Sequence, residues 1–247
     1  MTYPDDYLDK IICGDCLEVM PSIPDKSVDM ILCDLPYGTT QCKWDSVIPF
    51  KPLWEQYKRL IKNNGVMVLT ASQPFTSALI MSNVKMFKYE WIWDKVRKTG
   101  HLNAKKQPMR RTESILVFYN KQSKYNPQMI VSKPHVRGPF GKRKNETTVY
   151  GRFSDENRTY ESNEYYPDNV IKFCSEMKSI HPTQKPVALF EYLIKTYTNE
   201  GDTVLDNCIG SGTTAVACKN TGRHFIGIEK DPGYCKIAED RLRQGVL

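Results

Sequence analysis

The chain has 247 residues, 40% of them hydrophobic, and its 35 Lys and Arg against 28 Asp and Glu give a net charge of +7. This composition predicts a globular protein with a full core and excludes a disordered chain or a disulfide-stapled miniprotein. No apolar run approaches the roughly 18 residues of a membrane span, and the first residues lack the basic-then-apolar order of a signal peptide. We therefore expect a cytoplasmic protein whose eight cysteines are reduced thiols.

The first hundred residues alternate short apolar runs with helical patterns, which predicts a mostly parallel sheet covered by helices. A helix opened by Pro52 is expected to end at residues 63–65, because the sequence Asn-Asn-Gly is typical of a helix end. A second helix is predicted over residues 75–83. The predicted strands are residues 10–12, 28–33, 66–69, 89–93 and 114–119.

Residues 121–180 lack this alternation and are predicted to form an insert. Regular patterns return after residue 181, beginning with a helix opened by Pro186 and ending with a helix capped by Asp231. We therefore divide the chain into an N-terminal half of one domain, the insert, and a C-terminal half of the same domain, at residues 1–120, 121–180 and 181–247. The last part also contains predicted strands at 203–205 and 225–228 and a helix from about residue 212.

Charge is distributed unevenly along the chain. Residues 95–185 contain 19 basic and 8 acidic residues, whereas the rest of the chain contains 16 basic and 20 acidic residues. Residues 95–111 have seven cations and no carboxylate, as expected of a segment that follows a phosphate backbone. A solvated loop would have the same local composition, but the size of the asymmetry favours a polyanion, with nucleic acid the leading candidate. The candidate DNA-binding residues are Lys95, Arg97, Lys98, Lys105, Lys106, Arg110 and Arg111.

Residues 206–214 stand where a strand should turn into a helix, and their glycines allow a tight turn and a close approach of a ligand. Glu229 ends the next predicted strand, 19 residues after Gly210, where nucleotide-binding α/β units place a carboxylate that accepts hydrogen bonds from ribose. Together these features predict an adenosine-containing cofactor, against the alternative of a tight turn and a surface glutamate. No Gly-Lys-[Ser/Thr] follows, which excludes a P-loop.

The sequence Asp34-Leu35-Pro36-Tyr37 directly follows a predicted strand, so its side chains should emerge at the carboxyl edge of the sheet, where α/β folds bind ligands. Asp34 can accept a hydrogen bond from an exocyclic amine, and Tyr37 offers an aromatic face for stacking, as a flipped base requires. Taken alone, such a turn is also compatible with a purely structural role.

These two segments resemble the Asp-Pro-Pro-Tyr and Asp-Pro-Phe-x-Gly-Ser-Gly-Thr-Thr motifs of S-adenosylmethionine-dependent DNA amino-methyltransferases. Residues 12–16, 181–186 and 227–229 are similar to further motifs of that family, and the order of catalytic motif, basic segment and cofactor loop is that of its β class. The resemblance covers residues 10–243. It implies a Rossmann-like α/β methyltransferase fold, with a mostly parallel twisted sheet and helices on both faces. Residues 1–120 would then form the catalytic half of the domain, 121–180 an inserted target-recognition region, and 181–247 the cofactor-binding half.

The resemblance implies methyl transfer from S-adenosylmethionine to the exocyclic amine of adenine in double-stranded DNA, without a metal. Asp34 and the backbone carbonyl of Leu35, which stands where Pro is usual, would each accept one amine hydrogen. The implied catalytic residues are Asp34, Leu35, Pro36 and Tyr37. The implied cofactor-binding residues are Asp15, Cys16, Thr183, Lys185, Asp206, Asn207, Cys208, Gly210, Ser211, Gly212, Thr213, Thr214 and Glu229.

Several alternatives stay open. The same chemistry could act on the cytosine amine, although family motifs that open with Asp act mostly on adenine; carbon-5 methylation is excluded because the chain has no Pro-Cys pair. A nicotinamide-dependent oxidoreductase or a non-catalytic DNA-binding protein would leave the motif at Asp34 without a role. Cys13 and Cys16 have the spacing of a redox dithiol or half a zinc site. The resemblance also raises two further partners, a second copy of the chain and a cognate restriction endonuclease.

Overall fold

The computed structural model describes residues 2–39, 42, 45–137, 146–147, 151–152, 160–174 and 184–244. The chain forms two compact units, Pro127–Asp168 and the remainder, Met1–Asn126 with Asn169–Leu247. The smaller unit is narrower than the insert that we predicted at 121–180. Residues on both sides of it belong to the larger unit, because the amide of Asn126 donates to the carbonyl of Thr196 at 2.7 Å and residues 170–172 pair with a strand of the main sheet.

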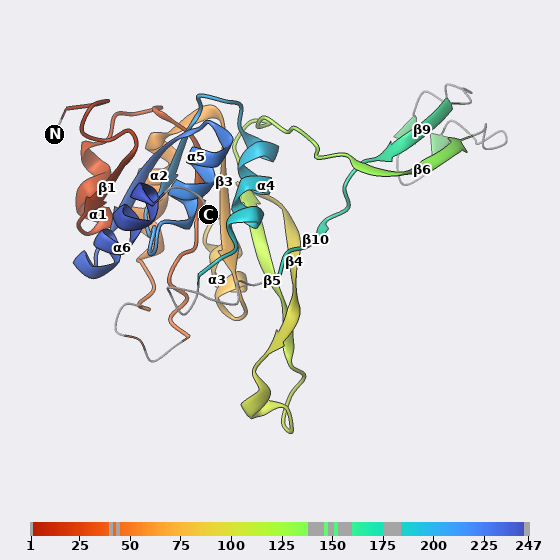
Figure 1. The fold of residues 1–247 in the computed structure, drawn as a ribbon, viewed down its shortest axis with the longest axis horizontal. Helices are drawn as coiled ribbons and strands as arrows, with labels where there is room; N and C mark the ends of the chain where they lie inside the picture. Colours follow the sequence, from red (N-terminus) through yellow and green to blue (C-terminus); the bar gives the residue numbers. More distant parts are fainter. Residues whose placement is uncertain are drawn as a thin grey trace. The chain divides into compact units, whose positions relative to one another are not determined.

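Eight of the described strands form one sheet in the larger unit, in the order β1-β12-β11-β2-β3-β5-β4-β10 (Figure 1). The five strands from β1 to β3 run parallel, whereas β5 runs antiparallel to both of its neighbours. This mostly parallel sheet confirms the predicted fold class. The strands are β1 (Lys10–Cys13), β2 (Val28–Cys33), β3 (Ile61–Ala71), β4 (Phe87–Thr99), β5 (Arg110–Phe118), β10 (Val170–Lys172), β11 (Thr203–Asp206) and β12 (His224–Glu229).

Helices cover both faces of this sheet, as the alternating pattern predicts. Leu53 and Tyr57 of α2 pack into one apolar cluster, and Phe190 and Leu193 of α4 pack into a second cluster with other residues of the sheet. No described helix has the length and apolar character needed to cross a membrane. The helices are α1 (Cys16–Val19), α2 (Phe50–Leu60), α3 (Phe75–Ser82), α4 (Val187–Tyr197), α5 (Thr213–Thr221) and α6 (Pro232–Arg243), with short 3₁₀ helices η1 (Met20–Ser22) and η2 (His101–Asn103).

The smaller unit contains two antiparallel strand pairs in its described residues. The first pair joins β6 (Ile130–Arg137) to β9 (Tyr160–Tyr165), and the second joins β7 (Glu146–Thr147) to β8 (Gly151–Arg152).

The predicted helix stop at residues 63–65 is wrong. The helix α2 ends at Leu60, and residues 63–65 lie inside β3. A Cβ atom on Gly65 would lie 2.7 Å from the backbone oxygen of Asp29, so this glycine permits close contact between β3 and β2. The local sequence Asn-Asn-Gly does not distinguish a helix end from a strand in which a glycine allows the neighbouring backbone to come close.

The strands predicted at 89–93 and 114–119 are the inner parts of a longer hairpin. β4 continues to Thr99 and β5 begins at Arg110, so most of the basic segment extends this pair away from the sheet (Figure 1). The outer residues of both strands are exposed, so they lack the alternating burial that marks a strand in sequence.

Gly212 provides a test of how closely the loop before α5 approaches α6. Its φ is +85°, and a Cβ atom there would lie 2.9 Å from Cβ of Ala238, whereas Gly201, with φ of +79°, has no atom within 4 Å of such a position. We expect Gly201→Ala to lower the free energy of unfolding by about 1–2 kcal/mol through backbone strain alone. Gly212→Ala should cost about 2–4 kcal/mol, since overpacking adds to the strain. Equal losses in chemical denaturation would contradict the close contact.

Candidate functional site

Parallel pairing brings the polar ends of four strands to one edge of the sheet. Asp15 lies just beyond β1 and Asp34 directly follows β2, while Asp206 and Glu229 are the last residues of β11 and β12. All four residues line one cavity of about 890 Å³. This volume lies at the upper end of the range for small-molecule sites, so it has room for more than one bound group.

The cavity joins the two motifs that the sequence analysis singled out. Gly212 does not line it, because that glycine packs on Ala238, and Thr183 lies outside the described residues. The predicted catalytic and cofactor-binding residues that do line it are Asp15, Cys16, Asp34, Leu35, Pro36, Tyr37, Lys185, Asp206, Asn207, Cys208, Gly210, Ser211, Thr213, Thr214 and Glu229.

The carboxylate of Asp34 is held by three donors. Its Oδ1 accepts hydrogen bonds from the hydroxyl of Tyr37, at 2.9 Å, and from the hydroxyl of Thr70. Its Oδ2 accepts one from Nζ of Lys185 at 2.7 Å. Since a carboxylate offers about four lone-pair positions, one acceptor position on Oδ2 has no donor among the described residues.

Lys185 contacts both motifs, because its ammonium group lies on Asp34 while its backbone carbonyl accepts a hydrogen bond from the hydroxyl of Thr213 at 3.4 Å. Its Nζ is also 3.6 Å from Oε2 of Glu113, and Oε1 of Glu113 accepts a hydrogen bond from Lys95 at 3.0 Å. Although burial lowers the pKa of Lys185, the carboxylates of Asp34 and Glu113 outweigh that effect and raise it. Lys185 therefore remains an ammonium ion that holds one face of Asp34.

Thr70 and Glu113 were missed by the sequence analysis. Thr70 is in β3, and Glu113 reaches the site because β5 runs antiparallel, which places the beginning of β5 beside the carboxyl ends of the parallel strands. The one available signal for Glu113 was its position as the first acid after the basic run. Strand direction, which decides its location, is not encoded in that local pattern.

Tyr37 connects the catalytic turn to an aromatic wall. Its ring stacks on Phe75, with 5.2 Å between ring centroids, and Nζ of Lys185 lies 5.6 Å from its ring centroid. Burial, and then the charge of Asp34, raise the pKa of Tyr37 well above its usual range. The phenol therefore stays protonated and acts as a donor to Asp34.

The part of the cavity that contains the loop 206–214 is built around Glu229 and Asp206. Oε2 of Glu229 accepts from the amide of Gly210 and Oε1 from the amide of Asp231, both at 2.9 Å. Asp206 accepts from the hydroxyl of Thr214 and, at 3.0 Å, from the amide of Cys208. Burial raises the pKa of Asp206 to about 7, whereas the amide of Leu17 and then Lys230 lower the pKa of Asp15.

The thiols do not form the dithiol that the Cys13 and Cys16 spacing allows. Cys16 shares a hydrogen bond with Cys208, and Cys13 shares one with Cys235. The bond to Cys208, together with burial, raises the pKa of Cys16 well above its usual range. A protonated thiol is a weak nucleophile, so Cys16 contributes to the cavity wall rather than to redox chemistry.

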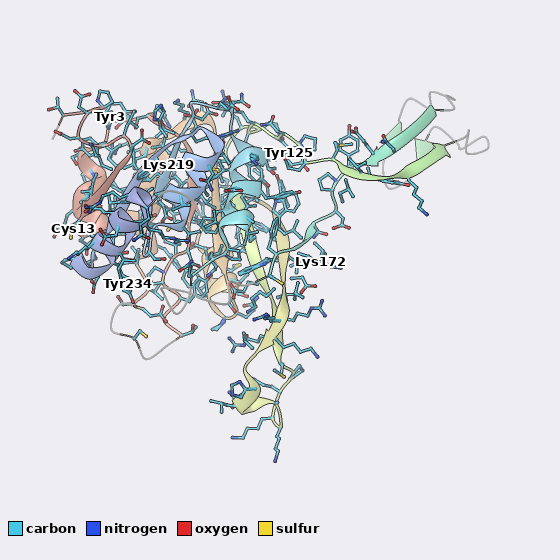
Figure 2. All side chains as sticks on the ribbon, in the orientation of Figure 1. Tyr3, Cys13, Tyr125, Lys172, Lys219 and Tyr234 are labelled. Atoms are coloured by element: carbon cyan, nitrogen blue, oxygen red, sulfur yellow. The ribbon has the colours of Figure 1, made fainter. Side chains whose placement is uncertain are left out.

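The candidate DNA-binding residues divide into two groups. Lys95 is buried against Glu113, and Arg111 donates to both oxygens of Asp94 at 2.7 Å, so these two cations fix the base of the hairpin. The other five are exposed on the hairpin, where many side chains end in nitrogen (Figure 2). They are Arg97, Lys98, Lys105, Lys106 and Arg110.

The comparisons with known proteins agree with the site. Residues 28–240 match the model of a DNA methylase family. The chain belongs to this family of DNA methylases.

Individual relatives agree with this assignment. The chain is 26% identical to the type II methyltransferase M.HpaI of Haemophilus parainfluenzae, and the match covers 94% of this chain and 74% of that protein. The chain is also similar to the protein in the crystal structure of an M1.HpyAVI–SAM complex, with 30% sequence identity and a TM-score of 0.63. That match covers 94% of this chain and 98% of the M1.HpyAVI chain. The fold is shared with the PvuII cytosine-N4-specific DNA methyltransferase, at a TM-score of 0.69 and 15% sequence identity. That match covers 94% of this chain and 85% of the PvuII enzyme.

S-adenosylmethionine is the cofactor of this methylase, and the residues present fit it. A Cβ atom on Gly210 would meet no atom of the described residues within 4 Å, so the left-handed turn at this glycine leaves space in their part of the cavity wall. Glu229 keeps acceptor positions beyond the two amides that it binds, and acceptors suit ribose hydroxyls. The turn at Gly210 and the carboxylate of Glu229 line the same cavity as the Asp34 turn.

The raised pKa of Asp206 predicts a pH-dependent stability of the cofactor-free methylase. Between about pH 4 and 7 an unfolded Asp206 ionises while the folded one stays protonated, so its stabilising contribution is complete below about pH 4 and lost as the pH rises through 7. Asp206→Asn mimics the neutral acid and should become progressively more stable than wild type over this range, in denaturation curves at each pH. Asp15→Asn is the control with the opposite sign. The pKa of Asp15 is lowered in the fold, so its carboxylate stabilises the folded state above about pH 4, and this contribution is lost in acid. A constant difference between wild type and Asp206→Asn would show that Asp206 is ionised in the fold.

Proposed function

We propose that this DNA methylase modifies the exocyclic amine of adenine and that Oδ2 of Asp34 receives one of the two amine hydrogens. The single observation that carries this proposal is the acceptor position of Oδ2 that has no described donor, in the cavity that also contains the cofactor loop. The carbonyl of Leu35 is proposed as the second acceptor. Both groups belong to the turn after β2, so a base bound there lies beside the cofactor residues.

The residues of this chain act by positioning and by electrostatics. The amine of adenine is a weak nucleophile because its lone pair is delocalised into the ring, and two acceptors favour the pyramidal geometry that localises it. Tyr37, Thr70 and Lys185 hold the Asp34 carboxylate in one orientation before the base arrives. S-adenosylmethionine, when bound, supplies an electrophilic methyl group. The base must leave the duplex to reach this cavity.

The same acceptors would serve the cytosine amine, and the PvuII enzyme shares the fold. The choice of adenine is supported by Asp at the first position of the catalytic motif, which in this family is found mostly in enzymes acting on adenine. The shape of the pocket around the ring distinguishes the two bases, so the methylated product is the decisive measurement.

Asp34→Ala should lower the rate of methyl transfer by about a hundredfold or more, because a preorganised polar contact at the reacting nitrogen is lost. Binding of S-adenosylmethionine should survive, since Asp34 lies outside the cofactor loop; calorimetry provides this control. Mass spectrometry of hydrolysed wild-type product should find the methyl label on adenine. Label that appears in cytosine alone would overturn the choice of base and leave the role of Asp34 intact.

We also propose that the exposed cations of the β4–β5 hairpin bind the phosphate backbone. They are grouped on the outer part of β4 and β5 and on the turn that joins these strands, and the hairpin begins at the cavity wall, where Arg110 and Thr99 line the cavity. The smaller unit, Pro127–Asp168, is proposed as the target-recognition region. A cytoplasmic location, a homodimer and a cognate restriction endonuclease stay predictions.

Replacing Lys98, Lys105, Lys106 and Arg110 together by Gln should reduce the slope of log Kd against log salt by about 3–4, since each phosphate contact contributes about 0.9. Sequence preference should change little, because phosphate contacts position the protein without specifying bases. Arg111→Gln is the matched control, because that arginine is already paired with Asp94. An unchanged slope in the fourfold variant would place the phosphate contacts elsewhere.

A further inference from the structure

The tip of the β4–β5 hairpin presents one large apolar side chain among cations. Leu102 is 88% exposed, the highest exposure recorded for a large hydrophobic residue in the described chain. Every residue from 96 to 108 is exposed, and no carboxylate occurs between Asp94 and Glu113. Single exposed hydrophobic residues are common on protein surfaces, so the placement of Leu102 has to be judged from its supporting structure.

The tip is an ordered turn. Gly100, with φ of +87°, precedes the 3₁₀ helix η2, and its carbonyl accepts from the amide of Asn103 at 3.1 Å. The carbonyls of His101 and Asn103 accept from the amides of Ala104, at 3.1 Å, and Lys106, at 2.9 Å. Leu102 is therefore presented by a hydrogen-bonded turn, which reduces the conformational entropy lost when it is inserted into a partner.

The base of the hairpin is fixed to the catalytic cavity. β4 is irregular between Asp94 and Thr99, where Val96 adopts a φ of +63° that is unusual for a β-branched residue, and Oδ1 of Asp94 accepts from the amide of Val96 at 2.8 Å. Arg111 holds the same aspartate from β5, while Lys95 and Glu113 link both strands to Lys185. These contacts give the arm a defined direction relative to Asp34.

The distance along the chain is short. Thr99 lines the catalytic cavity, and Leu102 is three residues further on, a span of at most about 10 Å. A target base that enters the cavity remains attached to its own strand, so the position it leaves in the stack must lie close to this wall. An apolar wedge between base steps is a common means of holding a duplex unstacked.

We propose that Leu102 enters the base stack of the DNA duplex as the target base leaves it. The flanking cations, Lys98, Lys105 and Lys106, bind the phosphates beside the opened step. The inference rests on the DNA methylase function and adds a positioning residue for base flipping. It does not depend on which amine is methylated.

The test compares wild type, Leu102→Ala and Leu102→Met on two duplexes carrying the site that sequencing of wild-type product identifies. One duplex is fully paired, and the other has a mismatch opposite the target base, so that the base is already partly unstacked. Leu102→Ala should lower kcat/KM on the paired duplex by about tenfold or more, because the variant lacks the apolar side chain whose contacts with the neighbouring bases offset the cost of unstacking the target base. On the mismatched duplex the loss should shrink to about twofold or less, and Leu102→Met, which keeps apolar volume, should retain most activity on both.

Fluorescence of 2-aminopurine at the target position gives a readout of flipping that does not require turnover. Emission should rise on binding wild type and rise less with Leu102→Ala, at equal occupancy. Met81→Ala is the matched control, since Met81 is 73% exposed on α3 and outside the hairpin. Equal losses on paired and mismatched DNA, an unchanged rate for Leu102→Ala, or a change confined to the oligomeric state in sedimentation would overturn the wedge. Absence of methyl transfer by wild type to any DNA would instead overturn the function on which the wedge rests.

Discussion

Parallel pairing of the strands from β1 to β3 is the constraint on which the site depends. Parallel strands end at the same edge of a sheet, so Asp34, Asp206 and Glu229 meet there although they are far apart in the chain. The interiors of the buried strands pack apolar side chains on both faces. The functional groups lie at the ends of these strands, as Asp206 and Glu229 do, and in the turns that follow them, as Asp34 does.

One antiparallel strand completes this arrangement. β5 begins where its parallel neighbours end, and it brings Glu113 to the cavity from the opposite chain direction. Glu113 and Asp34 together hold Lys185 as a buried ammonium ion, and Lys185 in turn fixes the carboxylate of Asp34. Removing Lys185 would take the counter-charge from Asp34, and removing Glu113 would leave the buried Lys95 without its partner, so each charge depends on the others for its position. A fixed acceptor is what a weakly nucleophilic amine requires.

The same strand pair joins the catalytic cavity to the arm that we propose binds DNA. β4 and β5 form the cavity wall at their inner ends and a basic arm at their outer ends, with the ion pair of Arg111 and Asp94 at the junction. The exposed cations of the arm have no carboxylate partner among the described residues, whereas Lys95 and Arg111 at its base are paired. The buried charges at the base are those of Lys95 and Asp94, and each requires a counter-charge; Arg111, although half exposed itself, supplies the one for Asp94.

The sequence by itself determined where most strands and helices of the larger unit lie along the chain, the fold class and both motifs, because each depends on residues close together in the chain. Apolar runs define buried strands, Asp231 caps α6 through its own neighbours, and a Gly-rich turn needs only local backbone freedom. The end of α2 at Leu60 and the lengths of β4 and β5 were decided by pairing between strands. Only the tertiary structure placed Lys185 on Asp34, 151 residues away, and brought Glu113 and Thr70 to them. Such contacts follow from the order of the strands within the sheet and from their direction, which no local pattern of side chains specifies.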